Sequence, residues 1–178
     1  MANSPEMKQL KYIALALLTA TLTVLPSCTV KYSFSGASIP ANAKTVSIAY
    51  FPNNAAMVAP ILSSTLTEAL KDRFARQTRL QQVPDGGDLA FEGEIVNYTS
   101  TTASVSSQEY AVLNRLTITV RVRFTNALEP QYNINNRTFS AFAGYDSSKL
   151  LQEVEGSLIP EIVEKLVDDI FNAAVSNC

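Results

Sequence analysis

The clearest hydrophobic pattern in the chain is an alternation of apolar and polar positions over residues 112–126. Successive side chains of a strand point to opposite faces, so this segment predicts a strand with one buried and one wet face. The inward positions are Leu116, Ile118, Val120, Val122 and Phe124, and the outward positions are Arg115, Thr117, Thr119, Arg121 and Arg123.

Three further segments predict strands. Residues 44–51 lie between two prolines and place Val46, Ile48 and Tyr50 on one face. Residues 131–145 form a weaker strand, in which Phe139 and Ala141 share a face and Phe142 is out of phase. Residues 88–105 begin with an alternation and continue as a polar Ser/Thr extension. One face carries Leu89, Phe91, Gly93 and Ile95, and the other Ala90, Glu92, Glu94 and Val96.

Two segments repeat apolar residues every three or four positions, which predicts helices. The first begins at Val58, tolerates Pro60 in its first turns and ends near Thr78, before a predicted hairpin turn at residues 85–88. The second follows an N-cap at Asp146 or Ser147, and Pro160 is predicted to kink or divide it. Its apolar stripe comprises Leu151, Val154, Leu158, Ile162, Val163, Leu166, Val167, Ile170, Phe171 and Ala174.

The element order is therefore strand, helix, three strands, helix. Each helix has one apolar face, and the sheet has one apolar face to match. The packing that buries these apolar faces against each other places two helices on one face of a four-stranded mixed or antiparallel sheet, an α+β fold. The opposite face of the sheet is then left open.

The N-terminal segment of the chain has the features of an export signal. Lys8 and Lys11 precede an apolar run over residues 12–24, which is short for a membrane span. Residues 25–28, Leu-Pro-Ser-Cys, resemble the bacterial lipobox. We expect a signal peptide over 1–27, a lipidated N-terminus and linker over 28–43, and one domain over 44–178.

The lipobox resemblance implies that Cys28 becomes the first residue of the mature chain and carries acyl chains, palmitate among them. Two or more chains make a membrane anchor stable. No acidic residue follows Cys28 directly, which favours the periplasmic face of the outer membrane. The second cysteine, Cys178, then has no partner within the chain and is interpreted as a free thiol.

The composition argues against catalysis. The chain has no histidine, so a Ser-His-Asp triad cannot be built and the commonest metal ligand is missing. Glu92 and Glu94 share a strand face and form a possible carboxylate pair, but an exposed face lacks the desolvation that acid–base work needs. The segment Asp85-Gly86-Gly87-Asp88 lacks the further oxygen ligands of a calcium loop. We expect no enzyme, no cofactor and no metal site.

The outward arginines of residues 112–126 are the most suggestive polar feature. Arg121 and Arg123 are successive outward positions, and Arg115 lies further back on the same face. Guanidinium groups suit phosphates and carboxylates, so Arg115, Arg121 and Arg123 are candidate anion contacts. Pairing with Glu92 and Glu94 across the strands is the favoured alternative. The slightly acidic balance of the chain does not suggest a nucleic-acid partner.

Six segments in order resemble the LptE-type lipopolysaccharide-assembly lipoproteins, in the form seen in Bacteroidetes. They are YSFSGASIP, TVSIAYFPNNA, LTEALKDRF, GDLAFEGEIVNY, LNRLTITVRVRFTN and EIVEKLVDDIFN. The resemblance implies two helices on a four-stranded sheet and a non-catalytic role. Such proteins plug the lumen of an LptD-type outer-membrane β-barrel, assist its assembly and help deliver lipopolysaccharide to the outer leaflet.

Two other interpretations remain open from the sequence. One is a periplasm-facing lipoprotein adaptor that binds another envelope protein or a peptidoglycan component. The other, more distant, is an enzyme that uses Glu92 or Glu94. The acidic side of the last predicted helix is interpreted first as a solvated face and second as a partner surface; it carries Glu153, Glu161, Glu164, Asp168 and Asp169.

Overall fold

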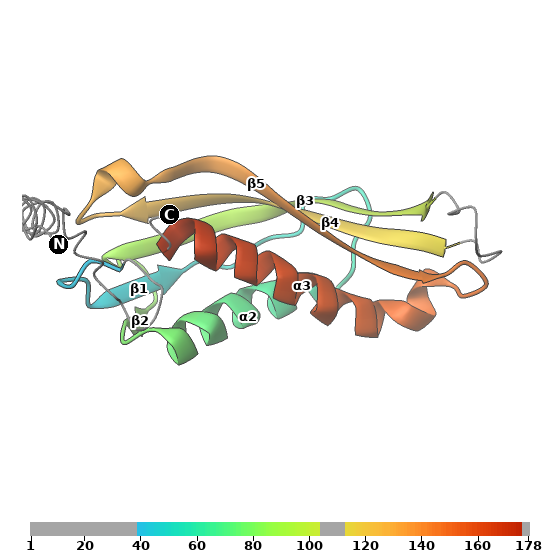
Figure 1. Cartoon of the computed structure of the whole chain (residues 1–178), viewed down its shortest axis with the longest axis horizontal. Helices are drawn as coiled ribbons and strands as arrows, with labels where there is room; N and C mark the ends of the chain where they lie inside the picture. Colours follow the sequence, from blue (N-terminus) through green and yellow to red (C-terminus); the bar gives the residue numbers. More distant parts are fainter. Residues whose placement is uncertain (1–38, 104–112, 176–178) are drawn as a thin grey trace, which may run out of the picture. The chain divides into compact units, whose positions relative to one another are not determined.

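The computed structural model describes residues 39–103 and 113–175, which belong to one compact unit, Ser33–Cys178 (Figure 1). Five strands, two α-helices and one short 3₁₀ helix occur in this part of the chain. They are, in order, β1 (Thr45–Ile48), α2 (Leu62–Gln77), β2 (Gln81–Val83), β3 (Leu89–Ala103), β4 (Leu113–Asn126), the 3₁₀ helix η1 (Pro130–Tyr132), β5 (Ile134–Asp146) and α3 (Leu151–Val175).

The five strands form a single mixed sheet in the order β2-β1-β3-β4-β5. β3, β4 and β5 make a long antiparallel meander, while β1 pairs in parallel with both β2 and β3. The predicted α+β class is confirmed, but the prediction of four strands is wrong. The missed strand, β2, has the sequence Gln-Gln-Val, and so short and polar a segment carries no alternation. It is a strand because its backbone pairs with β1.

Both helices lie on the same face of the sheet, as predicted, and they run side by side (Figure 1). The inward row of β4, from Leu116 to Phe124, is at most 1% exposed. Phe74 of α2 links the layers, because its ring centroid lies 4.9 Å from Phe91 of β3 and 5.0 Å from Phe171 of α3. Burying a side chain of this size stabilises the fold by about 1.5–3 kcal/mol.

The start of α2 differs from the prediction. The helix begins at Leu62, so Val58 and Pro60 precede it, and Val58 is 66% exposed. Tyr50, which was expected to share the buried face of β1, is 62% exposed because the strand ends at Ile48. The segment after β1 instead directs Phe51 into the core, where the Phe51 backbone N–H donates to Thr67 Oγ1 at 3.2 Å.

α3 is one continuous helix of 25 residues, so Pro160 does not divide it. Pro160 is exposed and borders a groove between α2 and α3. The predicted N-cap is also wrong, because the helix begins at Leu151. Glu153 Oε2 accepts a hydrogen bond from the Leu150 N–H at 3.2 Å, which is one half of a capping box. Asp146 closes the preceding turn by accepting from the Ser148 N–H at 2.8 Å.

Residues 85–88 do not form a hairpin turn, because β2 and β3 are parallel strands on opposite sides of β1. The connection between β2 and β3 crosses β1 at Ser47, whose Oγ accepts a hydrogen bond from the Gly87 N–H at 3.2 Å. Asp88 then accepts from the backbone N–H groups of Lys44 and Thr45, at 2.8 and 3.0 Å. These hydrogen bonds, led by that of Lys44, hold the pKa of Asp88 below its usual range. The segment that resembled a metal loop therefore fastens the start of β1.

A β-bulge between Ile95 and Asn97 changes the face on which the side chains of β3 lie. Beyond it, Tyr98 points into the core and is 2% exposed. Its hydroxyl donates to Glu155 Oε2 at 2.9 Å, and burial raises its pKa above the usual value. The bulge therefore ties the distal half of β3 to the first turns of α3.

We predict that Gly87→Ala destabilises the protein by about 1–3 kcal/mol. A Cβ at this position would lie 2.5 Å from the Ser47 backbone nitrogen and 2.8 Å from the Val46 carbonyl carbon, so β1 or the crossing segment must shift. Urea denaturation measures the change in the free energy of unfolding. Gly156→Ala is the matched control, because it meets nothing within 4 Å and should stabilise α3 by about 0.5–1 kcal/mol. Equal effects of the two substitutions would contradict the crossing geometry.

Candidate functional site: the open face of the sheet

One face of the sheet lies opposite the helices (Figure 1) and is called the open face below. It is polar along three strands. Its side chains come from Glu92, Glu94, Asn97, Thr99 and Thr101 of β3, Arg115, Thr117, Thr119, Arg121 and Arg123 of β4, and Thr138, Ser140 and Phe142 of β5. The strand register places these residues in rows across the sheet. The outward row predicted for β4 is confirmed as exposed or half-buried throughout.

Glu94 is held at the centre of a hydrogen-bonded group. One carboxylate oxygen accepts from Arg121 Nη1 at 2.7 Å, and the other accepts from Asn54 Nδ2 at 2.6 Å. The Asn54 amide contributes most, followed by Arg121, to a pKa of Glu94 below its usual range. The cross-strand pairing expected as the alternative is therefore present for Arg121, whose charge is largely engaged.

Arg123 has a different environment. It lies opposite Glu92 in the strand register, yet no carboxylate among the described residues lies within 4.0 Å of it. The facing part of β5 contains a register shift and the left-handed residue Asn136 (φ 51°). Both arginines and both glutamates line a shallow hollow of about 310 Å³ together with Pro52, Gly93 and Asn136. Arg123 is the cation of this hollow that remains available to an anion.

Arg115 lies apart from the other two arginines. It is six residues from Arg121 along the same strand, which corresponds to about 20 Å. Its guanidinium carbon lies 4.3 Å from the ring centroid of Phe142, an aromatic side chain that is 51% exposed. The sequence predicted that all three arginines share one face, with Arg115 further back. The structure places them in two groups on one face.

The carboxylates of the open face have the wrong environment for acid–base chemistry. A catalytic carboxylic acid needs a desolvated site that raises its pKa, whereas hydrogen bonds lower the pKa of Glu94.

Within residues 39–103 and 113–175, no group of three His, Cys, Asp or Glu side chains is placed to hold a metal ion. The helices of the same part of the chain include none that is long and apolar enough to cross a membrane. Cys28 and Cys178 lie outside the described residues.

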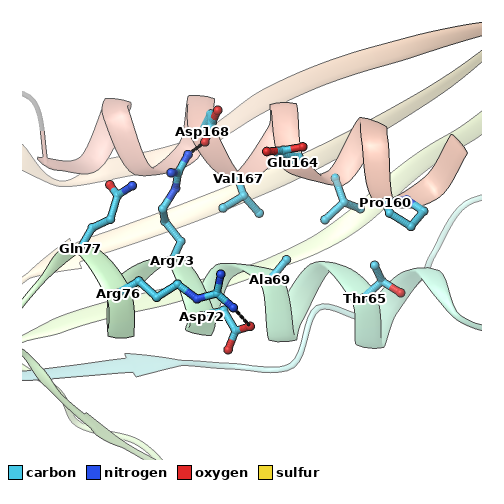
Figure 2. A pocket seen from close by; sticks show the side chains of 11 residues that line it. Thr65, Ala69, Asp72, Arg73, Arg76, Gln77, Pro160, Glu164, Val167 and Asp168 are labelled. Carbon is cyan, nitrogen blue, oxygen red and sulfur yellow. Dashed lines mark hydrogen bonds and ion pairs between the residues drawn. The ribbon is translucent and has the colours of Figure 1, made fainter. Parts of the chain in front are cut away.

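A groove between α2 and α3 was not predicted from the sequence (Figure 2). It has a volume of about 270 Å³, and its apolar lining comes from Ala69, Pro160, Val163 and Val167. Arg73 of α2 crosses the groove to pair with Asp168 of α3. Its guanidinium carbon also lies 5.6 Å from the Phe171 ring centroid. These contacts join the two helices, and only their packing brings the partners together.

The comparisons with known proteins identify the family. The family model for LptE, described as lipopolysaccharide-assembly, matches residues 43–174. The chain therefore belongs to the LptE lipopolysaccharide-assembly family, and the resemblance found from the sequence is confirmed at that level. No curated protein matches the chain.

Several solved structures resemble the fold. A hypothetical protein from Chlamydia trachomatis is 11% identical, with 74% of this chain and 98% of that chain covered and a TM-score of 0.49. A minor lipoprotein from Acinetobacter baumannii is 19% identical, with coverages of 73% and 91% and a TM-score of 0.42. An uncharacterized lipoprotein B from Nitrosomonas europaea is 12% identical, with coverages of 73% and 83% and a TM-score of 0.44.

The group around Glu94 predicts a pH-dependent contribution to stability. Because the folded pKa of Glu94 is depressed, its contribution is complete above the ordinary value of 4.5 and is lost as the pH falls through the folded pKa. Glu94→Gln should therefore lower the free energy of unfolding at pH 7, and the difference from wild type should shrink towards pH 3. Urea denaturation across this range measures it. Glu92→Gln, which removes no ion pair with another described residue, should change stability less at pH 7, and a larger effect there would contradict the assignment.

Proposed function

We propose that the mature protein is an outer-membrane lipoprotein, anchored through acyl chains on Cys28 and facing the periplasm. It acts without catalysis as a plug and assembly partner of an LptD-type β-barrel that exports lipopolysaccharide. The match of the LptE family model to residues 43–174 carries this proposal. The lipobox sequence at residues 25–28 supports the anchor.

The character of the open face supports a role inside a large barrel. A wide outer-membrane barrel has a polar, water-filled interior unless another body occupies it. The open face offers such an interior a surface rich in threonine, with charged side chains at Glu92, Glu94, Arg121 and Arg123. Burying these groups in the barrel costs little only where polar groups of the barrel replace their hydrogen bonds to water, and a polar interior supplies such partners.

Lipopolysaccharide phosphates are the proposed ligands of the arginines on this face. Arg123 is the strongest contact, since no described carboxylate lies within 4.0 Å of it. Arg121 contributes after a rearrangement that loosens its pair with Glu94. Arg115 adds a separate contact beside the exposed ring of Phe142.

Purification of the lipidated protein from the native membranes tests the partnership. We expect a very large β-barrel protein to co-purify, and we expect Cys28→Ala to leave the chain unlipidated and reduce its recovery with membranes. The mass of the mature chain measures lipidation directly. Reproducible absence of a barrel from the purified material would favour an adaptor that binds another envelope protein or a peptidoglycan component.

A charge reversal tests the phosphate contacts. Arg121→Glu with Arg123→Glu should weaken binding of lipopolysaccharide by about tenfold or more, because two charge-assisted contacts are replaced by repulsion. Arg79→Glu is the matched control, since Arg79 is an exposed arginine in the connection after α2 and lies outside the open face. Circular dichroism checks folding. Equal binding by all the variants would remove Arg121 and Arg123 from the proposal.

A further inference from the structure

β5 is the last strand on its side of the sheet, so no strand in the described part of the chain pairs with its outer edge. One backbone group on that edge is already occupied. Lys165 of α3 donates from Nζ to the Phe142 carbonyl oxygen at 3.1 Å, and the same Nζ lies 2.8 Å from Glu161 Oε1. The Phe142 carbonyl therefore points away from β4.

This orientation fixes the direction of the neighbouring backbone groups. In an antiparallel strand the N–H and C=O of one residue point to the same side, and the side alternates from residue to residue. Ser140 and Thr138 therefore also present their N–H and C=O groups to the outer edge. The 3.0 Å contact between the hydroxyls of Thr119 and Ser140 agrees with this, because side chains approach closely where opposite residues exchange no backbone hydrogen bonds.

The edge is blocked on both sides of these two residues. Towards the end of β5, Lys165 occupies the Phe142 carbonyl. Towards its beginning, the register shift and the left-handed Asn136 interrupt the regular strand. Charges and bulges are the usual devices that keep a sheet edge from pairing. Residues 137–141, called the edge window below, lie between the two devices and contain no lysine or proline.

A hollow of about 610 Å³ adjoins the edge window. Thr138, Phe139 and Ser140 line it from β5, and Asp169, Asn172 and Ala173 line it from α3. Arg137 borders the same hollow, with its guanidinium carbon 5.0 Å from the Phe139 ring centroid. In the described part of the chain, neither Arg137 nor Asp169 has an ion-pair partner within 4.0 Å. Unpaired strand edges beside a helix are used elsewhere to bind extended peptides.

We propose that the edge window binds an extended segment of another polypeptide, which adds to β5 as an antiparallel strand in the hollow beside α3. The backbone groups of Thr138 and Ser140 hold the segment. Charge complementarity defines its chemistry: a basic residue faces Asp169, and an acidic residue further along the segment faces Arg137. This site lies at the sheet edge and does not depend on the proposed function of the open face.

The position of α3 disfavours a second copy of this chain as the occupant. α3 packs mainly on β5, and neighbouring strands lie about 4.8 Å apart. Pairing of two β5 edges would bring two α3 helices close together over the joined edge, whereas the axes of packed helices need about 8–10 Å. An extended segment with no helix of its own on that side avoids this clash. A wall strand of a closed barrel is unsuitable as well, because its edges are already paired.

The test uses the full mature lipoprotein in detergent and the heptapeptide Thr-Lys-Val-Thr-Val-Glu-Thr as the probe. We expect saturable binding by fluorescence polarisation, with slower hydrogen exchange at the amides of Thr138 and Ser140. Ser140→Pro removes one edge donor at a position where the N–H faces outward, so the sheet tolerates it. It should weaken binding by about tenfold or more. Ser140→Ala keeps the donor and should bind as wild type does, and exchanging Lys and Glu in the peptide should weaken binding.

Three outcomes would overturn the proposal. The first is that the peptide does not bind at about 1 mM. The second is that the two variants at Ser140, both shown by urea denaturation to be folded, bind the peptide equally. The third is that the peptide slows hydrogen exchange at amides outside the edge window. Analytical sedimentation tests the remaining candidate occupant, a second copy of this chain. A dimer that Ser140→Pro abolishes would show that the edge pairs with a second copy instead.

Discussion

The fold depends on the burial of one face of β4 on the side of the sheet that carries the helices, where α3 packs against it. The five apolar side chains from Leu116 to Phe124 are almost completely inaccessible, and β4 lies between β3 and β5. Because successive side chains alternate, the same strand must present its arginines and threonines on the opposite face. Burial on one side therefore determines which residues the molecule offers on the other side.

The positions of the polar groups indicate what kind of interaction the molecule can make. The carboxylates and guanidinium groups of the open face lie at the surface, and some of them pair, as Glu94 does with Arg121. Such groups recognise other charged or polar surfaces and have little power as acids or bases. The open face and the edge of β5 are distinct surfaces, one made of side chains and the other of backbone groups. These two surfaces support the proposal that this member of the LptE family works by contact.

Sequence patterns predicted the features that arise from regular periodicity. The long strands β3, β4 and β5, the apolar stripes of the helices and the outward arginines all follow from periods of two or 3.6 residues. The patterns did not predict the features that depend on backbone pairing between strands or on the chain crossing over a strand. β2 forms because its backbone pairs with β1, and Gly87 is needed because the chain crosses β1 there. Pro160 is tolerated within α3 because the helix is held by burial on either side of it, at Ile159 and Ile162.

The candidate site was predictable in part for the same reason. The outward positions of Arg115, Arg121 and Arg123 follow from strand alternation, and the pairing of Arg121 with Glu94 follows from strand register. The role of Asn54 was not predictable, because it comes from an irregular segment after β1 that a parallel bridge between Asn53 and Ile95 places beside β3. The stacking of Arg115 on Phe142 requires the register of β5 as well.

The central claim is that the open face is the surface that contacts the partner in the outer membrane. A photoreactive residue at Thr119, in the middle of that face, tests it most directly when the protein is cross-linked in native membranes and compared with one at Arg79. We expect covalent adducts with a large β-barrel protein from position 119 and few or none from position 79. Adducts with the barrel from position 79 alone, or none from position 119 in repeated experiments, would contradict the account.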